Sequence, residues 1–210
     1  MDIDSVYPLL IPVGVVIATL AFWYVQRRRS KANFAALVSK LELQIDKHSG
    51  ELRATGERRG RTLTVFTYTT GFGKSKRRWV AVAAHVKDVG RLTFSLKQRV
   101  PIIDLILQLF RKCETKVGDQ AFDKKWVMVT NRPDYMSAAV LPEMREKMSR
   151  LGGNFLSDSS YKLDLYTLQY AQQGSFANAK LCARLAEQAE LVCDLADVME
   201  VGEEMKKSKA

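Results

Sequence analysis

The chain has 210 residues, of which 33 are Lys or Arg and 23 are Asp or Glu, so its formal net charge is +10. With 47% hydrophobic and 27% charged residues, its composition excludes a wholly disordered chain, a collagen-like chain and a polytopic membrane protein. The length accommodates one ordinary domain and a smaller appended segment. The charge is uneven, because residues 1–112 hold 20 basic and 8 acidic side chains whereas residues 113–210 hold 13 and 15. One end of the molecule is therefore expected to face an anionic partner.

An uncharged and almost wholly apolar run of 21 residues extends from Val6 to Gln26. A helix of about 20 residues crosses a hydrocarbon core of about 30 Å, so this run is long enough to span a membrane. Aromatic and then basic residues close the run, which is typical of a membrane interface followed by the cytoplasmic side. We predict a single-pass anchor over residues 1–29 in the cell inner membrane, with the N-terminus outside and the remaining chain in the cytoplasm. The predicted interface residues are Phe22, Trp23, Tyr24, Arg27, Arg28, Arg29 and Lys31.

A cleaved signal peptide and a buried core helix are the alternatives to an anchor. A signal peptide begins with positive charge and ends at a small-residue cleavage site, whereas Asp2 and Asp4 precede this run and arginines follow it. A core helix is rarely apolar on every face over such a length. The anchor is the favoured interpretation, and Gly14, Ala18 and Ala21 are small residues at which another membrane helix can approach closely.

The chain after the anchor divides into three predicted parts. Residues 30–50 combine good helix formers with apolar residues at helical spacing, which predicts a juxtamembrane helix or stalk. Residues 51–200 predict an α+β domain with a mainly antiparallel sheet and a long C-terminal helix. Residues 201–210 are predicted to form a disordered tail.

Alternating apolar residues around the polar turn Gly56–Gly60 predict a β-hairpin. Two further strands over residues 79–86 and 92–96 complete a predicted sheet of about four strands. Pro101 begins a short apolar segment that predicts a buried or interfacial helix over residues 101–110. Further along, we expect a strand at 126–130, helices at 133–139 and 142–151, a strand over 161–170 and an amphipathic helix over 176–199.

The segment from Val117 to Val129, followed by Leu141-Pro142-Glu143, resembles a pattern found in uncharacterised bacterial membrane-anchored proteins. The pattern reads G-D-x-x-F-D-x-x-F-x-V, and Trp126 stands where the family usually has Phe. The resemblance implies an α+β domain beneath a membrane anchor. It implies no established activity and no catalytic residues.

Known catalytic patterns are incomplete in this chain. Gly73-Lys74-Ser75 resembles the end of a phosphate-binding loop, but Tyr68 occupies the position of the required first glycine, which favours a basic hairpin tip. The two histidines, His48 and His85, and the three cysteines lack the spacing of a zinc site, so we expect free thiols, no metal and no cofactor. Asp119 and Asp123 are the most suggestive acids; we expect them to fix a turn and a strand start, with acid–base or metal chemistry as the alternative.

Basic residues gather after the anchor and at two predicted turns. Each cation held near an anionic leaflet contributes about 1 kcal/mol, so anionic lipids are the expected partner. Nucleic acid is disfavoured, because aromatic residues are not interleaved with the basic clusters. The candidate residues at the two turns are Arg58, Arg59, Arg61, Lys74, Lys76, Arg77 and Arg78.

These features favour a non-enzymatic accessory or assembly subunit of a larger membrane complex, for instance a respiratory or photosynthetic one, with other integral membrane proteins as partners. The first alternative is a sensor module for anionic lipid or another anionic ligand at the inner membrane surface. The second alternative is an enzyme whose site is assembled from residues distant in sequence.

Overall fold

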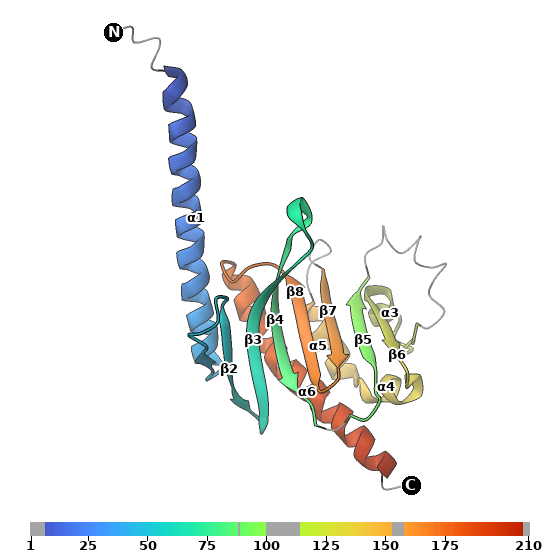
Figure 1. The fold of residues 1–210 in the computed structure, drawn as a ribbon. Helices are drawn as coiled ribbons and strands as arrows, with labels where there is room; N and C mark the ends of the chain where they lie inside the picture. Colours follow the sequence, from blue (N-terminus) through green and yellow to red (C-terminus); the bar gives the residue numbers. More distant parts are fainter. Residues whose placement is uncertain (1–6, 88, 100–113, 153–157, 208–210) are drawn as a thin grey trace.

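A computed structural model describes residues 7–87, 89–99, 114–152 and 158–207; within the first and last helices, side chains are described from Gly14 and up to Val201. Its centre is an eight-stranded sheet in which every neighbouring pair is antiparallel. The strand order is β1-β2-β3-β4-β8-β7-β5-β6 (Figure 1). The strands are β1 (Gln44–Ile45), β2 (Arg53–Arg58), β3 (Arg61–Thr70), β4 (Arg77–His85), β5 (Phe94–Gln98), β6 (Trp126–Thr130), β7 (Ser159–Asp164) and β8 (Thr167–Gln173).

Helices cover one face of this sheet. The long helix α6 packs against β4 and β8, α5 packs against α6, and the shorter α3 and α4 pack against β6 (Figure 1). The fold is therefore α+β with a mainly antiparallel sheet and a long C-terminal helix, which confirms that part of the prediction. The helices are α1 (Tyr7–Lys40), α3 (Gln120–Lys125), α4 (Pro133–Ala139), α5 (Pro142–Leu151) and α6 (Ala179–Lys207), with a short 3-10 turn η2 (Gly73–Ser75).

The period-2 pattern of the strands explains the core. Along β3, Leu63 and Val65 are fully buried on the helix-covered face, whereas Phe66 lies on the opposite face and is only partly buried. The apolar side of α6, including Leu185 and Val192, fills the same core. One sheet face is thus sealed by helices, and the other has no helix over it among the described residues.

Two turns determine the register of the sheet. Arg58 pairs with Arg61, so the β2–β3 turn has only two residues, Arg59 and Gly60, and both adopt positive φ as a tight hairpin turn requires. The predicted hairpin is confirmed, but β2 continues through residues assigned to the turn. The predicted strand over 161–170 is wrong as a single strand, because Leu165 at φ +52° begins a turn that separates β7 from β8. The sheet accordingly has eight strands instead of about four; the helix predicted over 101–110 lies outside the described residues.

The first helix runs without interruption into the domain. Phe34, Leu37, Val38 and Leu41, at its C-terminal end and just beyond, are buried in the core, so this segment is packed and does not form a free stalk. At the other end of the chain α6 continues to Lys207, which corrects the predicted disordered tail from residue 201. Among the residues that the structure describes, no helix is both long enough and apolar enough to cross a membrane.

Candidate membrane-facing surface

The β3–β4 hairpin extends beyond the sheet and ends in a tight tip, residues 71–76 (Figure 1). Gly71 has φ +83°, and a Cβ atom at this position would lie 2.5 Å from the carbonyl oxygen of Ser75. Only glycine fits such a position. The amide of Ser75 donates to the carbonyl of Phe72 at 3.0 Å and closes the turn. The tip therefore has a defined backbone conformation.

Aromatic residues brace the base of the hairpin. The rings of Tyr68 and Trp79 stack with centroids 6.2 Å apart, and the indole nitrogen of Trp79 donates to the hydroxyl of Thr70 at 2.8 Å. Gln169 donates to the Tyr68 hydroxyl at 3.4 Å. Partial burial of this phenol raises the pKa of Tyr68 above its usual value, so the group stays neutral at neutral pH. These contacts tie the projecting tip to the rest of the sheet.

The tip itself presents one large apolar side chain among cations. Phe72 is 94% exposed, which is the greatest exposure among the large apolar side chains of the described residues. The predicted cations Lys74, Lys76, Arg77 and Arg78 follow it within six residues and are all exposed. None of the ion pairs within the described part of the chain involves these four residues. We call residues 71–78 the basic tip.

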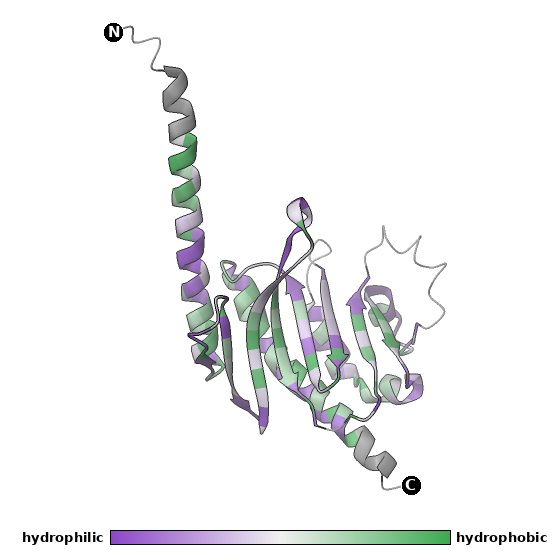
Figure 2. Cartoon of the chain, viewed as in Figure 1, coloured by the Kyte–Doolittle hydropathy of each residue, from purple (hydrophilic) through white to green (hydrophobic). Residues whose placement is uncertain are grey.

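The N-terminal part of α1 extends to the same side of the domain as the basic tip (Figure 1). Its described side chains are exposed and apolar, and Figure 2 shows this stretch as hydrophobic, next to a hydrophilic stretch that contains the arginines. Gly14, Ala18 and Ala21 are all exposed, and no other atom lies within 4 Å of a Cβ built on Gly14. The large exposed side chains of this stretch are Val15, Val16, Ile17, Leu20, Phe22, Trp23, Tyr24 and Val25.

Two contacts fix the direction in which α1 leaves the domain. The amide group of Asn33 donates to the carbonyl oxygens of Phe176 and Ala177 at 2.9 and 3.2 Å. The rings of Phe34 and Phe176 lie with centroids 4.8 Å apart. Because both residues sit on the last turns of α1, the preceding turns are held rigidly relative to the sheet.

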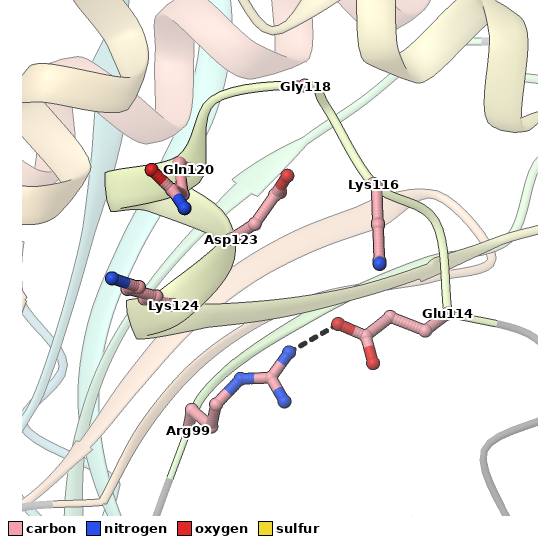
Figure 3. Close-up of a pocket in the computed structure, with 7 residues that line it drawn as sticks. All are labelled: Arg99, Glu114, Lys116, Gly118, Gln120, Asp123 and Lys124. Atoms are coloured by element: carbon pink, nitrogen blue, oxygen red, sulfur yellow. Dashed lines mark hydrogen bonds and ion pairs between the residues drawn. The ribbon is translucent and has the colours of Figure 1, made fainter.

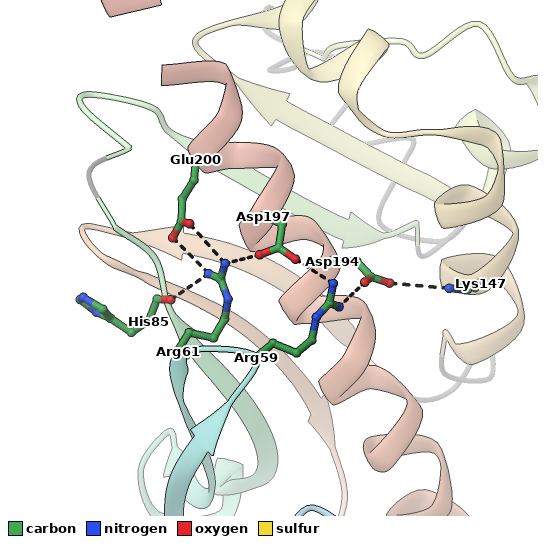
Figure 4. Close-up of polar contacts among 7 residues, drawn as sticks. All are labelled: Arg59, Arg61, His85, Lys147, Asp194, Asp197 and Glu200. Atoms are coloured by element: carbon green, nitrogen blue, oxygen red, sulfur yellow. Dashed lines mark hydrogen bonds and ion pairs between the residues drawn. The ribbon is translucent and has the colours of Figure 1, made fainter. Parts of the chain in front are cut away.

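The three predicted cations of the other turn have partners within the chain. Arg58 pairs with Glu190 at 2.5 Å, and Arg59 pairs with Asp194 and Asp197 at 2.5 and 2.9 Å (Figure 4). Asp194 also lies 3.6 Å from the amine of Lys147 on α5. The structure thus places this turn against α6 and gives its charges an intramolecular role.

Arg61 is the buried member of this group. Its guanidinium is bound by Asp197 and Glu200 and also donates to the carbonyl oxygen of His85 at 3.1 Å (Figure 4). The acids follow one stripe of α6, at positions 190, 194, 197 and 200, a spacing visible in the sequence that the sequence reasoning missed. An acidic stripe at helical spacing, together with a basic turn elsewhere in the chain, could have indicated that the two are paired by ion pairs.

Asp119 and Asp123 both accept backbone hydrogen bonds, but Asp119 caps the helix α3 and Asp123 lies within that helix, so neither has the exact role that we expected. Asp119 accepts the amides of Ala121 and Phe122 at 3.0 and 3.1 Å and begins α3, while Asp123 accepts the amide of Val117 at 3.1 Å. A hollow of about 710 Å³ lies beside Asp123 (Figure 3). Its walls include Arg99 and Glu114, which flank residues outside the described part of the chain. We therefore assign no function to this hollow.

The histidines and cysteines do not assemble a reactive site within the described residues. Cys182 and Cys193 are buried in α6 as free thiols, and His85 is exposed at the end of β4. Burial raises the pKa of the Cys182 thiol from its ordinary 9.0 to about 11, and burial also raises the pKa of Cys193. Both thiols are therefore protonated at neutral pH, the unreactive form. No group of three metal-ligating side chains occurs among the described residues.

Comparison with known proteins adds no relative: no protein-family model matches the chain, and no curated protein is significantly similar to it. The resemblance to bacterial membrane-anchored proteins stays a prediction.

Proposed function

We propose that the protein is a non-enzymatic, single-pass membrane-anchored module whose domain docks on an anionic leaflet through the basic tip. The observation that carries this proposal is the position of Phe72, which is 94% exposed among four cations without ion-pair partners in the described chain. An exposed aromatic ring inserts at headgroup depth, while neighbouring cations attract anionic lipid. The tip also projects to the same side as the apolar part of α1 (Figure 1).

The anchor in this proposal rests on the uncharged sequence from Val6 to Gln26, which begins before the described side chains of α1. The arginines that follow favour a domain on the cytoplasmic side of the inner membrane. Alkaline carbonate extraction of native membranes tests the anchor: the full chain is expected in the pellet. Its release into the supernatant would overturn the anchor.

Docking is tested by moving a fluorescent reporter to the tip. Phe72→Trp is expected to show a blue-shifted emission component that brominated phosphatidylglycerol quenches, in full-length protein reconstituted into vesicles. Leu165→Trp is the matched control, because Leu165 is 80% exposed in the turn between β7 and β8. Equal quenching of the two introduced tryptophans would refute docking through the tip.

A second candidate function, an accessory subunit of a larger membrane complex, is favoured by the uncovered face of the sheet. Phe66, Tyr68 and Gln169 line a hollow of about 490 Å³ on this face, where a partner protein can pack. The exposed Gly14, Ala18 and Ala21 offer a further contact for a membrane helix. Migration of the full chain as a lone monomer, under mild-detergent conditions that preserve other membrane complexes, would contradict this function.

A further inference from the structure

A separate hollow of about 510 Å³ lies where α1 leaves the domain. Its walls come from three parts of the chain: Trp23, Arg27, Ser30 and Lys31 on α1, the loop around residues 45–52, and the β4–β8 side of the sheet. Trp23 belongs to the predicted membrane interface. The hollow therefore opens at the level where lipid headgroups would lie if α1 spans the bilayer.

The charges of this hollow are separated by element. Arg27 and Lys31 come from α1 and Arg78 from the start of β4, so three cations line two of the walls. Two acids, Asp46 and Glu51, belong to the loop wall, where Asp46 accepts the backbone amide of His48 at 2.9 Å. None of the three cations has an ion-pair partner within the described chain. A cluster of cations without ion-pair partners, with hydroxyls beside it, suits a phosphate group.

The floor of the hollow is fixed before any ligand arrives. The hydroxyl oxygens of Ser30 and Ser175 lie 3.5 Å apart, and Asn33, one helical turn further, is hydrogen-bonded to the same loop. Arg27 is itself positioned, because its guanidinium carbon lies 5.2 Å from the centroid of the Trp23 ring. The backbone amide of Gly174 donates to the carbonyl of Arg78 at 3.0 Å and links the third cation to this loop.

We propose that this hollow binds the headgroup of an anionic phospholipid, with the phosphate among Arg27, Lys31 and Arg78. The inference rests on the proposed function, since only a membrane-anchored chain brings lipid to this level. It goes beyond that function because it names a discrete site that shares only Arg78 with the basic tip and does not include Phe72. The hydroxyls of a glycerol headgroup can donate to the carboxylates of Asp46 and Glu51, which accounts for the acidic wall.

The test uses the full-length chain in non-ionic detergent, titrated with phosphatidylglycerol, with bound lipid counted by native mass spectrometry. Each lost cation is expected to cost about fivefold in affinity, so the double variant Arg27→Gln/Lys31→Gln, which leaves the basic tip intact, should bind about 25-fold more weakly. The control variant Lys87→Gln/Lys97→Gln removes the same charge at exposed positions outside the hollow and should bind like the unaltered chain. Equal weakening of both variants would overturn the site, because it would show a dependence on net charge alone.

A second arm distinguishes the source of the phosphate. Free glycerol phosphate at the concentration of the lipid is expected to leave the bound phosphatidylglycerol in place; displacement would overturn the lipid as the occupant and assign the hollow to a soluble phosphate ester. Failure of this site is separable from failure of the proposed function. If Phe72→Trp is still quenched while phosphatidylglycerol binding is unchanged by the Arg27 and Lys31 substitutions, only the headgroup site is refuted.

Discussion

At the scale of single residues, Arg61 shows how a buried charge is retained. A guanidinium removed from water needs carboxylates and carbonyls around it, and Asp197, Glu200 and the carbonyl of His85 supply them. Arg58 makes an ion pair with Glu190, but its side chain is 30% exposed to solvent, whereas that of Arg61 is 6% exposed. The two arginines therefore differ in burial and in their partners, since Arg61 binds two carboxylates and a carbonyl and Arg58 binds one carboxylate.

Replacing Arg61 by Met is expected to lower the free energy of unfolding by about 2–3 kcal/mol, because two carboxylates lose their shared partner in a partly buried setting. Arg58→Met should cost less than about 1 kcal/mol, as exposed ion pairs usually do. Urea denaturation of the full chain, followed by the fluorescence of the buried Trp126, measures both values. Equal losses in the two variants would show that the burial of Arg61 is not what gives this ion pair its strength.

The raised pKa of Cys182 predicts a loss of stability at alkaline pH. Folding holds this thiol protonated to about pH 11, whereas the unfolded chain ionises near its ordinary pKa of 9.0. The stabilisation is therefore complete below about pH 9 and is lost as the pH rises towards 11, by an amount on the order of 1–2 kcal/mol. The Cys182 thiol also donates to the carbonyl of Phe176 at 3.4 Å, a contact that the thiolate cannot make.

Cys182→Ala separates this effect from general alkaline unfolding. Urea denaturation at about pH 8 and about pH 10.5 should show a smaller decrease for the variant than for the unaltered chain, since the alanine has no proton to lose. Any packing cost of the substitution is the same at both pH values and cancels in the difference. The same decrease in both proteins would assign the alkaline sensitivity to other buried groups, Cys193 and the tyrosines Tyr161 and Tyr170, whose pKa values burial also raises.

At the scale of elements, α1 is one uninterrupted helix with an exposed part that projects from the domain and a buried part that packs in its core. Phe22 is 65% exposed on the part that projects from the domain, and Phe34 is 1% exposed on the part inside the core. Two phenylalanines about three helical turns apart thus lie in different environments, one exposed and one buried in the core. One continuous helix therefore links the exposed, projecting turns directly to the packed core.

Phe34→Ala is expected to destabilise the domain by about 3–4 kcal/mol, because the cavity would lie against Phe176 in the core. Phe22→Ala should leave the free energy of unfolding unchanged within about 0.5 kcal/mol. Urea denaturation of the full chain in detergent compares them directly. A large effect at Phe22 would mean that the projecting turns pack on the domain in solution.

Local patterns in the sequence predicted most helices and strands but not the tertiary contacts between them. Trp126–Thr130, Pro133–Ala139 and Pro142–Leu151 match their predicted bounds, because a strand-forming run and two helix-starting prolines are local signals. The turn at Leu165 and Tyr166 was missed, since neither residue is a usual turn former and the alternation continues through it. Sequence located the cations of both turns, but the pairing with α6 depends on contacts more than 130 residues apart.

At the scale of the whole molecule, the charges that sum to +10 are unevenly distributed over the domain. Strand β3 starts at Arg61, where acids of α6 neutralise the neighbouring cations, and ends beside the basic tip, whose cations form no ion pair within the described chain. Its ten residues separate these ends by about 30 Å. This distance exceeds the Debye length of about 8–10 Å, so the two ends act on partners independently.

A domain docked through the basic tip should have one protected end. Amine acetylation of the full chain in vesicles, read by mass spectrometry, is expected to modify Lys74 and Lys76 at least about fivefold less in phosphatidylglycerol than in phosphatidylcholine. Lys87 lies beyond the opposite end of β4 and should react equally in both. Adding salt should restore the reactivity of the tip, because screening weakens attraction between exposed charges. Protection of Lys87 together with the tip would indicate that the domain lies flat on the membrane, and protection of neither would mean that the domain stands clear of it.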